Sequence, residues 1–292
     1  MLSVDVTTPL NEELETLSSE SKARVIAVAL HDLESGLQFS LHGDRWFHAA
    51  STIKVAVLLA IFRAADEGRL RLDDSLHVRN RFISAADGSS FHLNRDSDAM
   101  PELYQAIGRT AKISALAEGM IASSSNLATN LLLDFVGVEY ARNVLRDAQV
   151  DGVELRRGVE DYAAHERGIN NEVTADGLVR LLSALRGGFL SPQSKEQAIG
   201  ILLEQRFNSM IPAGLPAHAA VAHKTGEIST ACHDIGIVYL PEREPYVAVI
   251  LTEFDSEGDG RREIVAAISE AIYRSVMGME PKGNERSVIA RG

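Results

Sequence analysis

The sequence predicts an α/β (α+β) fold: a five-stranded antiparallel sheet flanked by N- and C-terminal helices, plus an inserted all-helical lobe. Apolar, β-branched strand patterns occur only near the two ends of the chain, within 24–41 and 219–253. Helical periodicity fills the residues between them. Two early and three late strands form one sheet only if the ends of the chain meet, so the helical segment must leave the sheet and return to it.

The first part of the chain is expected to form a helix and then a hairpin. A threonine precedes Pro9, as at many helix N-termini, and leucines at positions 10, 14 and 17 give one apolar stripe. Segments 24–31 and 37–41 flank the turn-forming residues 34–36, which predicts two antiparallel strands.

The remaining elements follow from the same periodicities. We expect helices at 53–66, 100–107, 127–135, 139–148, 175–185 and 195–204. We expect strands at 219–225, 232–240 and 246–253, and a last helix at 261–277. A discontinuous sheet lobe would then combine residues 1–50 and 212–292, and the helical lobe would span 51–211. An active site would lie in the seam between the lobes, where clefts commonly form.

Composition narrows the class of protein. The chain has 292 residues, of which 45% are hydrophobic and 24% charged, as in ordinary globular proteins. Its formal net charge of −12, without a basic cluster, argues against nucleic-acid binding. The single cysteine, Cys232, excludes an internal disulfide and a thiolate metal cluster, and we expect it in the core. A nucleophilic Cys232–His233 pair is the alternative, which the opposite orientation of adjacent strand residues disfavours.

The start of the sequence has no basic n-region and no apolar h-region, so no signal peptide is visible. No apolar run is long enough to span a bilayer. As given, the chain is therefore expected in the cytoplasm, or in the periplasm or outside the cell if a leader is missing. We expect a monomer that acts on a small molecule, without a metal or a cofactor.

Ser51 and Lys54 begin a long apolar helical segment and are the strongest functional signal. Because they are three residues apart on a helix, they share one face. Ser51 lies in the first turn, where free backbone N–H groups stabilise developing negative charge. A partly desolvated Lys54 could take the serine proton. Ser-x-x-Lys also occurs at 19–22 in a polar segment, so this pattern alone is weak.

Two further motifs follow at fitting distances. Segment 124–126 (Ser-Ser-Asn) begins one predicted helix, and segment 224–226 (Lys-Thr-Gly) ends one predicted strand. With Ser-x-x-Lys before them, they resemble the ordered motifs of the penicillin-recognising serine hydrolases, and the chain resembles a class A β-lactamase from about residue 10 to about residue 277. The resemblance implies a two-lobed serine hydrolase that opens β-lactam rings through an acyl-enzyme.

The resemblance also implies which residues perform the chemistry. Ser51 would be the nucleophile and Lys54 its activating neighbour. The backbone N–H groups of Ser51 and Glu227 would form the oxyanion hole. Ser124 would pass a proton to the leaving nitrogen.

A second set of residues would hold the substrate. Lys224 would attract a substrate carboxylate, and Thr225 would add a hydrogen bond. Asn126 would donate to the substrate amide and accept from the catalytic lysine, while Gly226 would let the substrate approach the strand edge. No arginine anchor for the carboxylate is evident after this motif, and His233 stands nearby in sequence.

Class A enzymes release the acyl group with a glutamate on a long loop, which here corresponds to 157–171. The usual Arg-x-Glu-x-x-x-Asn spacing is not reproduced. Glu160, one residue late, is the preferred candidate, and Asp161 and Glu166 compete with it. All three could instead be solvated loop carboxylates. Ser125 stands where class A enzymes usually have aspartate, a second departure.

Two other functions stay open. A D-alanyl peptidase, an esterase or an amidase on the same scaffold would acylate with penicillin and release it slowly, as a slowly deacylating penicillin-binding protein does. A β-lactam-binding or sensory module would keep a stable adduct and no longer turn over.

Overall fold

The computed structural model describes residues 7–278 and is built on one antiparallel sheet with the strand order β10-β11-β12-β1-β2. Its strands are β1 (Val25–Asp32), β2 (Gln38–Leu41), β10 (Ala220–Ile228), β11 (Ala231–Tyr239) and β12 (Tyr246–Glu253). The early and late strands meet where β1 pairs with β12, with Val25 opposite Glu253. The predicted fold class is therefore confirmed.

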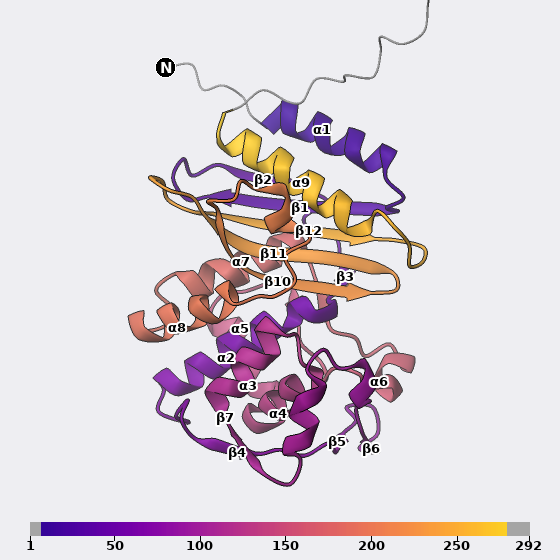
Figure 1. Ribbon diagram of the computed structural model, residues 1–292, viewed down its shortest axis with the longest axis vertical. Helices are drawn as coiled ribbons and strands as arrows, with labels where there is room; N and C mark the ends of the chain where they lie inside the picture. Colours follow the sequence, from indigo (N-terminus) through magenta and orange to yellow (C-terminus); the bar gives the residue numbers. More distant parts are fainter. Residues whose placement is uncertain (1–6, 279–292) are drawn as a thin grey trace, which may run out of the picture.

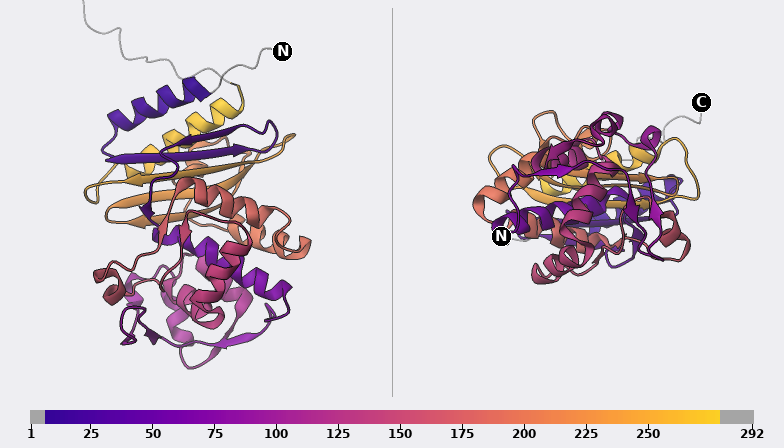
Figure 2. Two further views of the ribbon diagram at one scale, coloured as in Figure 1. Left: turned by 180° about the vertical axis from the view of Figure 1, so that it is seen from behind. Right: turned by 90° about the horizontal axis from the view of Figure 1, so that it is seen from below.

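Helices cover both faces of this sheet (Figures 1 and 2). Helices α1 (Thr7–Glu20) and α9 (Arg261–Val276) lie on one face, and α7 (Ala175–Arg186) lies on the other. In β12, Ala248 and Ile250 join the core beneath α1 and α9, whereas Val247, Val249 and Leu251 join the core on the opposite side. Because both of its faces are buried, β12 is an almost continuous apolar run, whereas the edge strand β2 alternates between exposed and buried residues.

The helical lobe surrounds α2 (Lys54–Asp66). Its other helices are α3 (Ile113–Ala122), α4 (Asn126–Val136), α5 (Val138–Asp147), α6 (Tyr162–Glu166) and α8 (Pro192–Leu203). Helix α2 is apolar on all sides and is buried on all sides, as such a sequence requires. The core around it continues into Ala222 and Ile237 of the sheet, so the two lobes share one apolar interface. Their division at residues 50 and 211 stays a prediction.

Several local elements differ from the sequence-based expectation. The predicted helix at 100–107 is a 3₁₀ helix, η3 (Pro101–Ala106), and α3 was not predicted. Gly119 lowers the helix propensity of α3, and the Met100 side chain packs against it, with Sδ 2.8 Å from the position that a Cβ would take. Short strands also pair within the helical lobe, for example β4 (Ser75–His77) with β7 (Thr110–Lys112). Strands of two or three residues are too short to give a periodic signal.

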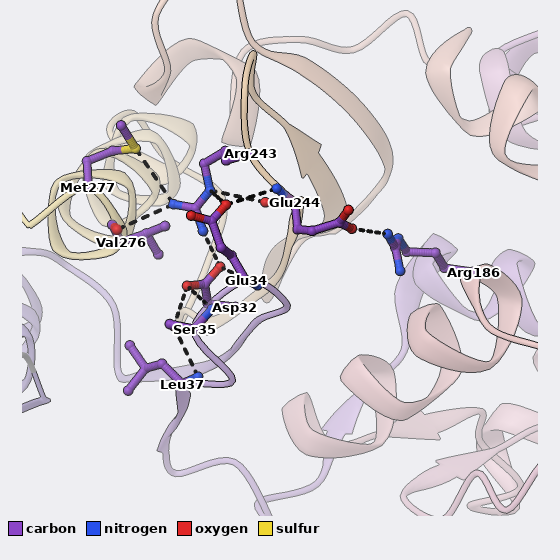
Figure 3. A network of polar contacts seen from close by, with 9 residues as sticks. All are labelled: Asp32, Glu34, Ser35, Leu37, Arg186, Arg243, Glu244, Val276 and Met277. Carbon is purple, nitrogen blue, oxygen red and sulfur yellow. Dashed lines mark hydrogen bonds and ion pairs between the residues drawn. The ribbon is translucent and has the colours of Figure 1, made fainter.

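A polar network links two of the sheet's hairpin turns, β1–β2 and β11–β12, to α7 (Figure 3). Arg243, between β11 and β12, donates to Asp32 and lies 3.6 Å from Glu34 at the β1–β2 turn. The next residue, Glu244, accepts from Arg186 at the end of α7 at 2.9 Å. The Arg243 and Asp32 side chains are largely buried, so their pairing is shielded from solvent. Within the described residues, no helix is both long and apolar enough to cross a membrane.

Candidate active site

Ser51 lies in the 3₁₀ turn η1 (Ala50–Ile53), which continues directly into α2. The preceding residue, Ala50, has a φ of 46°, a left-handed conformation that is costly for a residue with a Cβ. Such strain is typical of functional turns that are held by the surrounding structure. Thr52 and Ile53 are buried, whereas Ser51 is partly exposed and lines a pocket of about 260 Å³.

Lys54 is fully buried and directs its amine toward the turn before α4. Its Nζ donates to the Ser124 carbonyl oxygen at 2.6 Å, to Ser124 Oγ at 3.1 Å and to Asn126 Oδ1 at 2.7 Å. Burial lowers the pKa of Lys54 to about 7, against the opposing influence of the Asp98 and Glu160 carboxylates. A substantial fraction of this amine is therefore neutral near pH 7 and able to accept a proton.

Ser124 lies between the two buried lysines. Its φ is 59°, and its hydroxyl contacts Lys54 Nζ at 3.1 Å and Lys224 Nζ at 3.0 Å. Burial, together with the nearby charge of Lys54, lowers the pKa of Lys224 well below its usual value. A hydroxyl placed between two amines can pass a proton from one side to the other. The structure thus brings together the side chains of all three sequence motifs.

Strand β10 is an edge strand of the sheet, paired there with β11, and it lies close to the turn η1 that contains Ser51. A Cβ on Gly226 would lie 3.1 Å from the Ser51 backbone nitrogen and 3.0 Å from Thr52 Cγ2. The absence of a Cβ at Gly226 allows this close approach of two backbones. From the sequence, this glycine was expected instead to let the substrate approach the strand edge. Thr225 lines the same pocket as Ser51, and so does Glu227 after the glycine.

Glu160 is the loop carboxylate that reaches the lysine network. Its Oε1 accepts a hydrogen bond of 2.6 Å from Asn126 Nδ2, while Asn126 Oδ1 accepts from Lys54. Glu160 also has a left-handed φ of 57°. The loop is fixed from α4 by Asn130, whose Oδ1 accepts from Val159 N at 2.8 Å and whose Nδ2 donates to Val159 O at 2.9 Å.

The two competing carboxylates lie elsewhere. Asp161 is buried and accepts hydrogen bonds from Ser84 Oγ, from Ala85 N and from Ala164 N at the start of α6. Asp161 therefore caps the N-terminus of α6 and links this loop to Ser84 and Ala85. Glu166 is exposed at the end of α6. Of the three candidates, Glu160 is the one that contacts a residue of the lysine network.

His233 and Cys232 do not form a reactive pair. His233 is fully buried, its Nδ1 accepts from Thr252 N at 3.1 Å, and its Nε2 lies 3.0 Å from the His48 carbonyl oxygen. Burial lowers the pKa of His233 to about 4, so the ring is neutral and cannot anchor a carboxylate. Cys232 packs against Met210 in the core beneath α9, as expected for a small core residue, and burial raises the pKa of its thiol to about 12.

Sequence reasoning missed two residues near the pocket, Arg262 and Asp98. Arg262 lines the pocket and donates to Glu227 Oε2 from Nε at 3.1 Å and from Nη2 at 2.9 Å. A larger hollow of about 540 Å³ is also lined by Glu227 and Arg262. Basic residues at a helix N-terminus are unfavourable because they oppose the helix dipole. Arg261 and Arg262 both begin α9, so the sequence could have indicated that these arginines have a role other than helix stability. Asp98 lies in an ordinary polar run and gave no signal.

No group of three or more His, Cys, Asp and Glu side chains within residues 7–278 is arranged to hold a metal ion.

This architecture, a sheet lobe and a helical lobe with a serine–lysine centre between them, defines an acyl-transferring serine hydrolase. The family model for the β-lactamase enzyme family matches residues 9–276, and the chain belongs to that family. The predicted family and hydrolase class are therefore confirmed.

Individual relatives agree with this assignment. Beta-lactamase ROB-1 of Haemophilus influenzae is 26% identical over 271 residues, which cover 91% of this chain and 84% of the relative. An ancestral class A β-lactamase has 26% identity and a TM-score of 0.79, with 91% of this chain and 99% of the other covered. PBP-A has the same identity, 26%, and the same TM-score, 0.79, over 93% of this chain and 97% of its own. A PBP-A variant similar to this chain was solved as an acyl-enzyme complex with penicillin G.

Proposed function

We propose that this chain is a serine hydrolase of the class A β-lactamase type that opens β-lactam rings through an acyl-enzyme on Ser51. The observation that carries the proposal is the position of the Ser124 hydroxyl, 3.1 Å from Lys54 Nζ and 3.0 Å from Lys224 Nζ, at a pocket that Ser51 and Ser124 both line. Family membership supports the same class of reaction.

Acylation begins at Ser51. Its Oγ attacks the lactam carbonyl carbon while its proton passes to the neutral amine of Lys54, whose lowered pKa of about 7 suits it to this task. Backbone N–H groups of Ser51 and Glu227 stabilise the oxyanion, and the close approach of Gly226 to the Ser51 nitrogen supports this assignment.

Ring opening needs a proton on the leaving nitrogen. Ser124 Oγ lies within hydrogen-bond distance of Lys54 Nζ, so the proton taken from Ser51 can pass through the Ser124 hydroxyl to that nitrogen as the C–N bond breaks. Lys224 holds the other side of this hydroxyl and favours its transient negative charge. The product is an ester between Ser51 and the opened lactam.

Deacylation requires a water molecule and a base. Glu160, held by Asn126 beside the lysine network, is the group to which we assign removal of a proton from that water. The water oxygen then adds to the ester carbonyl carbon, the bond to Ser51 Oγ breaks, and the serine regains a proton. We assign substrate binding to Asn126, Lys224 and Thr225, with Arg262 as an additional cation at the pocket wall.

A fluorescent penicillin tests the acylation step. We expect covalent label on the parent and none on Ser51→Ala. Full labelling of Ser51→Ala, or no labelling of a correctly folded parent, overturns the proposal. Hydrolysis of nitrocefin tests the complete cycle, since multiple turnovers require deacylation as well as acylation.

A peptidase-like or slowly deacylating penicillin-binding protein is the second candidate, because PBP-A and an ancestral class A β-lactamase match this chain with the same TM-score of 0.79. Such a protein would give one burst of nitrocefin opening, equal to the enzyme concentration, and then stop. Sustained turnover that depends on Glu160 favours the lactamase.

A further inference from the structure

We infer that Asp98 is a positioning residue for the catalytic turn 124–126 and that it supplies, from a separate segment, the carboxylate that this turn lacks at Ser125. The inference rests on the proposed function of Ser51, Lys54 and Ser124, and it concerns how their geometry is held.

Asp98 is 5% exposed and lies directly after the 3₁₀ turn η2 (Arg95–Ser97). Its Oδ2 accepts from Leu127 N at 2.8 Å, and it also lies 3.3 Å from the Tyr104 hydroxyl and 3.4 Å from Ser125 Oγ. Its Oδ1 accepts from Met100 N at 2.9 Å. One buried carboxylate thus joins the segment before η3 to the first turn of α4.

The hydrogen bond between Leu127 N and Asp98 also affects the orientation of the Asn126 side chain. Ser125 is the N-cap of α4, and its Oγ accepts from Ala128 N at 3.2 Å. Leu127 N is another of the N–H groups that the helix itself cannot satisfy, and Asp98 satisfies it. Asn126, between the N-cap residue Ser125 and the capped Leu127, therefore begins α4 in a fixed orientation toward Lys54 and Glu160.

Asp98 also connects this turn to the pocket wall. Its sequence neighbours Ser97 and Ala99 line the same pocket as Ser51 and Ser124. A side chain that anchors both the wall and the catalytic turn fixes the width of the pocket at the reacting serine.

The charge of Asp98 acts on Lys54 as well. Burial lowers the pKa of Lys54, and the two groups that oppose this shift are the Asp98 carboxylate, with the larger influence, and the Glu160 carboxylate. Lys224 faces the same Ser124 hydroxyl from β10, and Tyr104 faces Asp98 from η3. Removal of the Asp98 charge should therefore move the titration of Lys54 to lower pH.

Two single variants separate the effect of the Asp98 charge from the effect of its hydrogen bonds. Asp98→Asn keeps a group of the same size and an acceptor oxygen but removes the charge, and Asp98→Ala removes both. We expect Asp98→Asn to shift the acidic limb of the acylation rate to lower pH by at least half a unit, and Asp98→Ala to slow acylation by about tenfold or more. Asp96→Asn is the matched control, because Asp96 is an exposed carboxylate two residues away; its rate and pH profile should match those of the parent.

A double variant that moves the carboxylate from position 98 to position 125 tests the positioning role of Asp98. The double variant Asp98→Ala with Ser125→Asp places a carboxylate at the N-cap itself, a position that favours aspartate. We expect it to recover most of the acylation rate that Asp98→Ala loses. A double variant no faster than Asp98→Ala, with both proteins folded by circular dichroism, overturns the positioning role.

A measurement that does not depend on enzyme activity distinguishes a failure of this inference from a failure of the proposed function. NMR titration of the Lys54 amine in the Asp98→Asn and parent proteins should show a lower pKa in the variant, whether or not penicillin reacts. Equal Lys54 titration in both proteins contradicts the inference even if the parent is an active lactamase. A parent that fails to react with penicillin, while Lys54 titrates lower in the variant, rejects the proposed function and leaves the Asp98 contact established.

Discussion

Asn126 donates a hydrogen bond of 2.6 Å to Glu160. The same side chain accepts a bond of 2.7 Å from Lys54 through its other polar atom. Because a carboxylate accepts and an ammonium donates, these two partners fix which way the amide points. A single amide thus connects the base that we assign to acylation with the base that we assign to deacylation.

The first prediction separates these two steps. Glu160→Gln should acylate within about threefold of the parent rate but deacylate about 10²–10³ times more slowly, because it loses the base for water. Rapid mixing with penicillin followed by mass spectrometry measures both rates. The comparison is best made at pH 8, where Lys54, with a pKa of about 7, is mostly neutral in the parent.

Glu166→Gln is the matched control for this experiment, since Glu166 is an exposed glutamate of the same loop. It should deacylate like the parent. A parent-like deacylation rate in Glu160→Gln would assign the water-activating role to another group.

The second prediction concerns pH. Lys54 accepts the serine proton only when it is neutral, and its pKa of about 7 lies far below that of an ordinary lysine. The acylation rate should therefore rise with pH through about 7 and fall about tenfold per pH unit well below it. Stopped-flow acylation between pH 5 and 9 measures this profile. Lys54→Arg, which stays charged, should lose at least about 10³ in rate; a flat parent profile would exclude Lys54 as the base.

Two of the three motifs could be located from the sequence because they lie at helix starts: Ser51 precedes α2 and Ser124 precedes α4. Lys224 instead lies in the middle of β10, which continues to Ile228, beyond the end at 225 that the sequence predicts. The order of the motifs along the chain, rather than the position of Lys224 in the strand, identified it. The strand and helix order then required the chain ends to meet, which is the fold observed.

The remaining site residues depend on contacts that no local pattern encodes. Glu160 and Asp161 are adjacent, and contacts with other segments decide which carboxylate turns toward the lysines: Asn130 holds Val159, and Ser84 and Ala85 hold Asp161. Asp98 lies between the non-periodic turns η2 and η3 and reaches Leu127 of α4, 29 residues further along the sequence. Arg262 enters the pocket from α9 because the sheet brings the start of that helix beside the end of β10.

The third prediction tests the close approach of β10 to η1, the turn that contains the proposed nucleophile Ser51. Gly226→Ala would place a Cβ 3.0–3.1 Å from Thr52 Cγ2, Ala50 Cβ and the Ser51 nitrogen. The strand must then move away from the oxyanion site, and kcat/KM for nitrocefin should fall by about 10²-fold. Gly200→Ala is the control, because no atom lies within 4 Å of its added Cβ and Gly200 is inside α8. That change should leave activity unaltered and stabilise the protein by about 0.5–1 kcal/mol.

The fourth prediction concerns substrate recognition by Arg262, which is paired with Glu227 at the pocket. A substrate carboxylate must compete with Glu227 for this guanidinium. Arg262→Ala should therefore raise KM about tenfold, whereas Glu227→Gln should lower it by releasing the arginine. The methyl ester of the same penicillin serves as the control, since neither substitution should change its KM. Equal effects on acid and ester would remove Arg262 from carboxylate recognition.

The fifth prediction links catalysis to stability through the buried amine of Lys54. The unfolded chain keeps this lysine protonated up to about pH 10.4, whereas the folded protein releases the proton near pH 7. Between these values the unfolded state binds more protons, so the free energy of unfolding rises with pH over this range and the stability penalty is greatest at and below about pH 7.

Lys54→Met removes the titrating group but keeps an unbranched side chain of similar length in the core. It should abolish acylation and stabilise the fold at pH 6 by roughly 1–3 kcal/mol, with a smaller gain at pH 9, where the parent amine is neutral in the fold. Urea unfolding of both proteins at the two pH values measures the difference. The hydrogen bonds of Lys54 to Ser124 and Asn126 are lost at both pH values and lower the gain at each; the change of the gain with pH follows from the different protonation of Lys54 in the folded and unfolded chain. An identical difference at pH 6 and pH 9 would mean that the buried amine keeps an ordinary pKa, and the proton transfer from Ser51 would then need another acceptor.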